Sequence, residues 1–251
     1  MAPEGAMIPE DKIREFVTRI REAAGPNLVS VILYGSAASG EFHPKYSNLN
    51  LFCVLRETSF ALLQELAPAA KWWNGQKQPS PLFMSRNELE RASDVFAIEL
   101  LDMQRYHRVL LGTDVLQDLK IPMHLHRVQV EYELREKLIL LRQQALLVSE
   151  SKRDLWALLL HSVSSFTTLF RHALITLGHE APTDRRQTVQ ALAKRVGFDP
   201  APLQQVLDVR EHKADPAKIE IQDLFARYLA AVEQATTAVD EVLDSDTSGP
   251  A

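Results

Sequence analysis

Residues 31–40 read VILYGSAASG, and residues 47–52 read SNLNLF. The first segment closes a run of Val, Ile and Leu that extends from Leu28 to Tyr34 and is followed at once by glycine. Such a run predicts a strand that is buried on both faces. A second apolar run, Leu49 to Leu55, predicts another strand. The sequence therefore predicts two buried strands separated by a short polar connection.

The Gly-Ser pair, Gly35 and Ser36, suits a place where the backbone passes close to a phosphate. Glycine carries no side chain to block the approach, and serine supplies a hydroxyl and an amide that can donate to phosphate oxygen. Gly-Ser pairs are common in ordinary turns, so this interpretation depends on the strands around the pair. Because alternate residues of a strand face the same way, Asn48 and Asn50 are expected to share a face.

An apolar strand, a Gly-Ser pair, about a dozen residues and a polar-apolar-polar-apolar strand together resemble the nucleotidyltransferase superfamily. That superfamily includes minimal antitoxin-like proteins and antibiotic adenylyltransferases. The resemblance covers roughly residues 10–120 and implies that Gly35 and Ser36 bind nucleotide. The family's Asp-x-Asp pair, which grips divalent cations, is replaced here by Asn48 and Asn50. The family places its last acid on a strand, and Glu99 is the matching residue.

The two amides change what this site can bind. With an effective dielectric near 20, unit charges about 4 Å apart interact by roughly 4 kcal/mol, so losing two carboxylates weakens metal binding by orders of magnitude. Nucleotidyl transfer depends on that metal. Glu99 alone cannot assemble a two-metal clamp, and Asp102, the second choice for the last acid, would face the other way on a strand. Ser39 is a further departure, because related proteins often have arginine there.

Apolar spacing along the rest of the chain predicts two domains. Before residue 120, helices are expected at 11–24, 59–73 and 85–92, and strands at 81–84 and 95–103. After Pro122 only helices are expected, the first with apolar residues from Val130 to Ala145 and the others at 155–177, 183–196, 202–210 and 221–243. We predict an α+β fold: a nucleotidyltransferase-like mixed sheet with flanking helices (1–120), an antiparallel helical bundle (121–244) and a disordered tail (245–251).

Composition excludes several classes of function. The net charge of −5 provides no general attraction to nucleic acid or to anionic lipid, so bulk binding of either is not expected. The single cysteine, Cys53, lies in an apolar run and is expected to be a buried hydrophobe, without a disulfide. No basic leader or long apolar segment is visible, and a cytoplasmic location is the default expectation.

Other candidate residues favour structural roles. His124 and His126 are expected at the surface, because a spacing of two points them apart on a helix. At least one of Trp72 and Trp73 is expected in the core. His107, with Arg108 beside it, is expected to be structural. Companion helical ribonucleases carry arginine followed four to six residues later by histidine, and Arg171, His172 and His179 do not have that spacing.

The leading hypothesis is a catalytically impaired member of the superfamily that binds a nucleotide or another phosphate ligand. The first alternative is an active transferase that moves a nucleoside monophosphate from a triphosphate to a small molecule or protein, with Glu99 as its acid. Magnesium and a nucleoside triphosphate are expected as cofactors only under this alternative. The second alternative is an antitoxin-like interaction protein, with a protein partner or a second copy bound through the helical domain.

Overall fold

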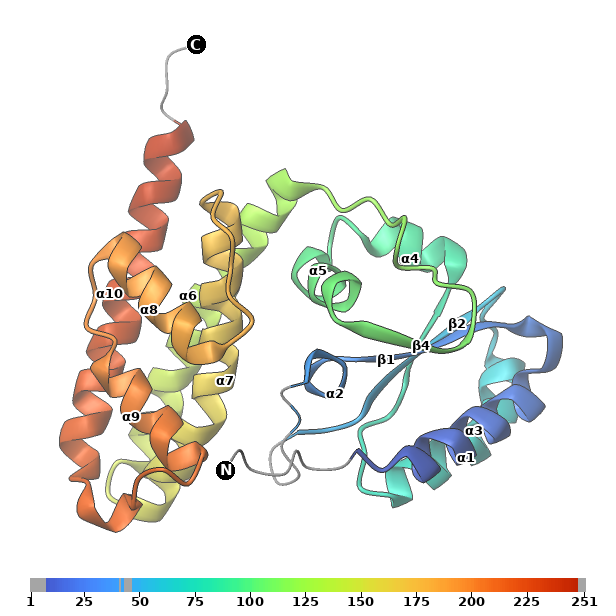
Figure 1. Ribbon diagram of the computed structural model, residues 1–251, viewed down its shortest axis with the longest axis horizontal. Coiled ribbons are helices and arrows are strands. Elements are labelled where there is room, and N and C mark those ends of the chain that lie inside the picture. Colours follow the sequence, from blue (N-terminus) through green and yellow to red (C-terminus); the bar gives the residue numbers. More distant parts are fainter. Residues whose placement is uncertain (1–7, 41, 43–46, 248–251) are drawn as a thin grey trace. The chain divides into compact units, whose positions relative to one another are not determined.

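The computed structural model describes residues 8–40, 42 and 47–247 and divides into two compact units (Figure 1). The first unit is Met1–Pro122 and contains the sheet, and the second is Met123–Ala251 and is helical. The predicted α+β class is confirmed. Within the described residues, no helix is both long enough and apolar enough to cross a membrane.

The sheet of the first unit has four described strands in the order β3-β2-β1-β4. These are β1 (Leu28–Tyr34), β2 (Asn50–Leu55), β3 (Leu82–Ser85) and β4 (His107–Gly112). Strand β1 is antiparallel to β2 and to β4, and β2 is parallel to β3. The sheet is therefore mixed, as predicted, and the two predicted central strands lie beside each other in it.

Helices cover both faces of this sheet (Figure 1). On one face, α1 (Glu10–Ala24) and α3 (Phe60–Gly75) pack with the inward side chains of β1 and β2 around the fully buried ring of Trp73. On the other face, α5 (Ala97–Arg105) and α4 (Arg86–Ala92) pack against a second apolar cluster. That cluster contains Ile32, Phe52, Val54, Leu89, Leu100 and Met103. Burial on both faces confirms the prediction for β1 and β2.

The strand predicted at residues 95–103 is wrong, because this segment belongs to α5. Its buried residues are Ala97, Ile98, Leu100 and Met103, spaced as on one side of a helix. The spacing of apolar residues in such a short segment is compatible with a helix or with a strand. Here the segment forms a helix, which covers one face of the sheet. The strand that follows, β4, begins only at His107 and was not predicted.

The second unit is a helical bundle. Its long helices are α6 (Met123–Val148), α7 (Lys152–Thr176) and α10 (Ile221–Thr247), and its shorter ones are α8 (Arg185–Val196) and α9 (Ala201–Arg210). Arg135 and Arg142 of α6 form ion pairs with Asp240 and Glu233 of α10, respectively. Because the partner number falls as the α6 number rises, these two helices are antiparallel.

Short elements complete the two units. They are the four-residue helix α2 (Ser36–Ser39) and the 3-10 turns η1 (Gly25–Asn27) and η2 (Pro216–Lys218). Helix α10 continues to Thr247, so the expected disordered tail is wrong for residues 245–247, and residues 248–251 lie outside the described part of the chain.

Candidate functional site

The pairing of β1 with β2 brings the two motif segments together. Tyr34, the last residue of β1, is paired with Asn50, the first residue of β2. The Gly-Ser turn therefore begins beside Asn50. A Cβ atom added to Gly35 would lie 3.0 Å from Nδ2 of Asn50, so the glycine backbone and the amide are in direct contact.

Local backbone geometry explains why glycine precedes serine here. Gly35 has φ 77° and ψ −151°, a conformation that is nearly restricted to glycine. The turn lets α2 begin at Ser36, and Gly40, with φ 82° and ψ 5°, ends the helix in the left-handed region. Residue 35 is thus fixed as glycine by its own dihedral angles and by its neighbour Asn50.

The start of β2 is anchored from outside the sheet. The Leu49 amide donates a 2.8 Å hydrogen bond to Oε1 of Gln78, in the connection that follows α3. Strand β2 begins at Asn50, so Asn48 precedes the strand and is exposed, whereas Asn50 is half-buried. Among the described residues, neither asparagine side chain forms a hydrogen bond to another group of the protein.

Three polar side chains form a row across the sheet at this end. Tyr34 pairs with Asn50 on one side and with His107 of β4 on the other. Side chains of directly paired residues project from the same face, which here is the face covered by α5. Sequence reasoning missed Tyr34 as a site residue, although its position directly before Gly35 was a usable signal.

Glu99 reaches this row from a helix and not from a strand. It lies in the first turn of α5, so the expected strand position of this acid is wrong, whereas its match to the family's last acid stays a prediction. The prediction that Asp102 faces the opposite way from Glu99 assumed a strand and is also wrong, because residues three apart on a helix lie on the same side. Burial, and secondarily the charge of Glu99, raise the pKa of Tyr34. Glu99 is therefore close enough to Tyr34 for its charge to be felt there.

His107 has an acidic partner. Its Nε2 atom lies 2.9 Å from Oδ2 of Asp114, and the other carboxylate oxygen, Oδ1, accepts hydrogen bonds from the amides of Leu116 and Gln117. Partial burial opposes ionisation of Asp114, but the hydrogen bonds, with that from His107 foremost, outweigh it and lower the pKa of this carboxyl. The structural role expected for His107 remains a prediction.

The donor set does not fit the divalent cations that this fold implies. None of the four described strands contains an aspartate or a glutamate. In addition, the described residues contain no group of three or more His, Cys, Asp or Glu side chains that could hold a metal ion. Hard cations prefer anionic oxygen ligands, and the two amides offer one neutral oxygen each. No step of a reaction is therefore assigned to metal here.

Residues 11–107 match the family model of a nucleotidyltransferase domain. The first unit belongs to the nucleotidyltransferase superfamily. The match spans the sheet up to the start of β4 and includes Gly35, Ser36, Asn48, Asn50 and Glu99. Within this nucleotidyltransferase domain the fold is kept, whereas the acidic pair is not.

Solved structures agree with this fold. The chain is similar to spectinomycin adenyltransferase AAD(9) from Enterococcus faecialis, with 14% identity and a TM-score of 0.60 over 93% of this chain and 100% of that chain. A nucleotidyltransferase-like protein from Exiguobacterium sibiricum also aligns, with 14% identity over 94% of this chain and 74% of that chain, but its TM-score is 0.32 and supports no argument. No curated protein sequence matches the chain significantly.

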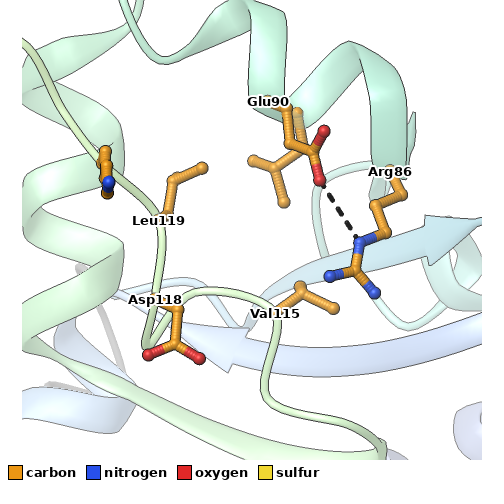
Figure 2. Close-up of a pocket in the computed structure, with 7 residues that line it drawn as sticks. Arg86, Glu90, Val115, Asp118 and Leu119 are labelled. Carbon is orange, nitrogen blue, oxygen red and sulfur yellow. Dashed lines mark hydrogen bonds and ion pairs between the residues drawn. The ribbon is translucent and has the colours of Figure 1, made fainter.

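A hollow in the first unit lies between α4 and the segment after β4 (Figure 2). Its charged lining residues are Arg86, Glu90, Asp118 and Lys120, two of each sign, and Arg86 is paired with Glu90. No predicted site residue lines it. With balanced charge and exposed polar groups, the hollow provides no excess positive charge for a phosphate ligand.

The structure shows where the remaining candidate residues lie. The prediction that His126 lies at the surface is wrong: it is fully buried, and its Nε2 lies 2.8 Å from Nδ1 of His172, while His124 is exposed. Trp73 is buried as predicted for at least one of the two tryptophans. Cys53 is also buried and forms no disulfide.

Proposed function

We propose that the nucleotidyltransferase domain of this protein binds a nucleotide or a similar phosphate ligand and does not catalyse metal-dependent nucleotidyl transfer. One observation carries the proposal: the Gly-Ser turn and its glycine geometry are present, but no described strand supplies a carboxylate. A turn of this kind suits a phosphate, whereas transfer needs a metal to neutralise charge and to align the attacking oxygen.

Charge decides between binding and transfer. Each missing carboxylate removes roughly 4 kcal/mol of attraction for a neighbouring unit charge about 4 Å away, at an effective dielectric near 20. For a divalent ion the lost attraction at each of the two positions is twice as large, because the interaction energy is proportional to the charge of the ion. A Cβ atom on Gly35 would lie 3.0 Å from Nδ2 of Asn50, and this proximity supports a neutral amide next to the Gly-Ser turn at the position where the family resemblance implies a metal ligand.

Restoring the acids tests this proposal. ATP is a suitable nucleotide because the structurally similar spectinomycin adenyltransferase was crystallised with it. The double variant Asn48→Asp/Asn50→Asp should gain Mn²⁺ binding, measured by the electron paramagnetic resonance of free Mn²⁺, relative to the native protein. A control with the same added charge, Gln143→Glu/Gln144→Glu at exposed positions of α6, lies outside the site and should gain none. Equal Mn²⁺ binding by native protein and site variant would contradict the proposal.

Transferase activity is the second candidate, favoured by the position of Glu99 beside Tyr34. It predicts that native protein labels an acceptor with radioactive AMP from ATP in the presence of Mg²⁺. Glu99→Gln should then abolish labelling, while Glu90→Gln on α4 should not. Labelling by native protein that is lost in Glu99→Gln would replace the binding proposal by this one, and absence of labelling in native protein would reject it.

A further inference from the structure

Three side chains with hydrogen-bond donors lie in or next to the Gly-Ser turn. Asn50 contacts Gly35, Ser36 follows Gly35 in the chain, and Tyr34 both precedes Gly35 and pairs with Asn50. Among the described residues, none of these three side chains is hydrogen-bonded to another group of the protein. These half-buried donors are open to a ligand, and a ligand with several acceptor oxygens matches such a set of donors.

Tyr34 remains a donor over the physiological range. Burial, and then the nearby charge of Glu99, raise the pKa of its hydroxyl, so the phenol stays protonated. The amide of Asn50 has two N–H donors, whereas a carboxylate at the same place would only accept. The substitution therefore changes the sign of the interaction with an anion: a group that needs a cation between itself and phosphate is replaced by one that can donate to phosphate directly.

We propose that this site binds the phosphate of a nucleotide as the free anion, without a divalent cation. The inference rests on the proposed binding function and adds to it the ionic form of the ligand. Ser36, Asn50 and Tyr34 donate to the phosphate oxygens. The described strands add no carboxylate to the negative charge of Glu99 on α5, which is felt at Tyr34 and which these donors must outweigh.

This arrangement predicts the direction in which Mg²⁺ changes the affinity for the phosphate ligand. Mg²⁺ in solution occupies phosphate oxygens and holds its own waters tightly. A site with carboxylates compensates by coordinating the ion, but the two amide positions cannot do so effectively. Mg²⁺ therefore competes with the protein donors for the same oxygens and should weaken binding, which is opposite to what a pair of acidic metal ligands would give.

Calorimetry on the full chain tests the inference with three probes: ATP, inorganic tripolyphosphate and adenosine. Each is titrated once in EDTA and once in excess Mg²⁺. We expect ATP and tripolyphosphate to bind in EDTA and to bind at least several-fold more weakly in Mg²⁺. Binding of ATP only with Mg²⁺, failure of ATP to bind in either buffer, or binding of adenosine as tight as that of ATP would each overturn the inference.

Variants identify the donors. Asn50→Asp should weaken ATP binding in EDTA by at least tenfold and reverse the effect of Mg²⁺, whereas Asn87→Asp, with the same added charge on α4, should bind like native protein. Ser36→Ala, which removes only a hydroxyl, should weaken binding several-fold in EDTA. Circular dichroism confirms that each variant is folded. Unchanged binding in both Asn50→Asp and Ser36→Ala would reject the assigned donors.

The two proposals fail in different ways. Transfer of AMP from ATP to an acceptor in Mg²⁺ would reject the proposed function. Binding of ATP that requires Mg²⁺, without any transfer, would leave the proposed function standing and reject only the metal-free form of the ligand.

Discussion

Nδ2 of Asn50 lies so close to Gly35 that a Cβ atom added to the glycine would be only 3.0 Å from it. This contact joins the two motif segments, which are about a dozen residues apart in the chain. The strand pairing that produces it, Tyr34 with Asn50, follows from two apolar runs joined by a connection that returns antiparallel. The backbone of the turn at Gly35 and the side chain at position 50 therefore restrict each other.

Gly35→Ala should destabilise the first unit by about 1–3 kcal/mol, because alanine at a strongly positive φ is strained. The new methyl group must also displace the Asn50 amide. Urea unfolding monitored by fluorescence of the buried Trp73 measures the change. Gly75→Ala at the end of α3 is the matched control, since a Cβ there meets nothing within 4 Å, and it should not lower the midpoint. Equal stability of Gly35→Ala and native protein would contradict the prediction that alanine is strained at this position.

Much of the first unit was predictable because its signals are local. The strand Leu28–Tyr34 was predicted with the bounds that the structure gives, because a short run of Val, Ile and Leu that ends at glycine is typical of a buried strand. The helix predicted at residues 85–92 is likewise confirmed as α4 (Arg86–Ala92), because Ser85 and Glu88 satisfy backbone donors within its first turn. The proximity of Gly35 and Asn50 depends in addition on the antiparallel pairing of β1 with β2, which was not predicted and is seen in the structure.

Glu99 and His126 could not be placed from local signals. The apolar residues of 95–103 are spaced in a way that suits a helix or a strand. The segment from Ala97 onward forms the helix α5 because it packs on one face of the sheet, which the local sequence does not show. His126 is buried because His172, 46 positions away in the chain, supplies a partner for its ring nitrogen. No spacing in the sequence indicates that pairing, so a buried polar pair between two helices is visible only in the structure.

The His126–His172 pair should show strong energetic coupling. Thr176 donates to the carbonyl of His172 and lies 3.2 Å from Nδ1 of His126, so the three residues form one buried chain of hydrogen bonds. His172→Leu should cost about 1–3 kcal/mol because it leaves buried groups unsatisfied. Removing both rings, His126→Leu/His172→Leu, should cost less than the sum of the single changes.

A double-mutant cycle on these two histidines gives the coupling from four urea unfolding curves at neutral pH. His124→Leu, at an exposed site on the same helix, controls for the general effect of the substitution. Strict additivity of the two single changes would show that the buried hydrogen bond contributes nothing measurable.

Cys53 should be unreactive in the folded protein. It lies at the centre of β2 and is buried, and burial raises the pKa of its thiol well above its ordinary value. Since the thiolate is the reactive form, a thiol reagent should label the native protein only as fast as the sheet opens. Rates measured by absorbance should increase steeply with urea. Rapid labelling without denaturant would show that β2 is accessible and would contradict the packing described.

The capping box at α4 gives a stability contribution with a defined pH dependence. The Ser85 amide donates to Glu88 at 2.6 Å, and the Glu88 amide donates to the Ser85 hydroxyl at 3.2 Å. The hydrogen bonds from the backbone and then the side chain of Ser85 lower the pKa of Glu88. Because the folded pKa lies below the unfolded one, the contribution is present above the ordinary glutamate range and is lost as the pH falls through the folded pKa.

Glu88→Gln should therefore be less stable than native protein at neutral pH, and the difference should shrink as the pH falls below about 4, the ordinary range for glutamate. Ser85→Ala should cost about 1 kcal/mol at neutral pH through loss of the N-cap. Urea midpoints across this pH range measure both effects, with Glu90→Gln on the same helix as the control. A difference between Glu88→Gln and native protein that grows on acidification would mean that Glu88 is stabilised more in its protonated form, opposite to what its hydrogen bonds require.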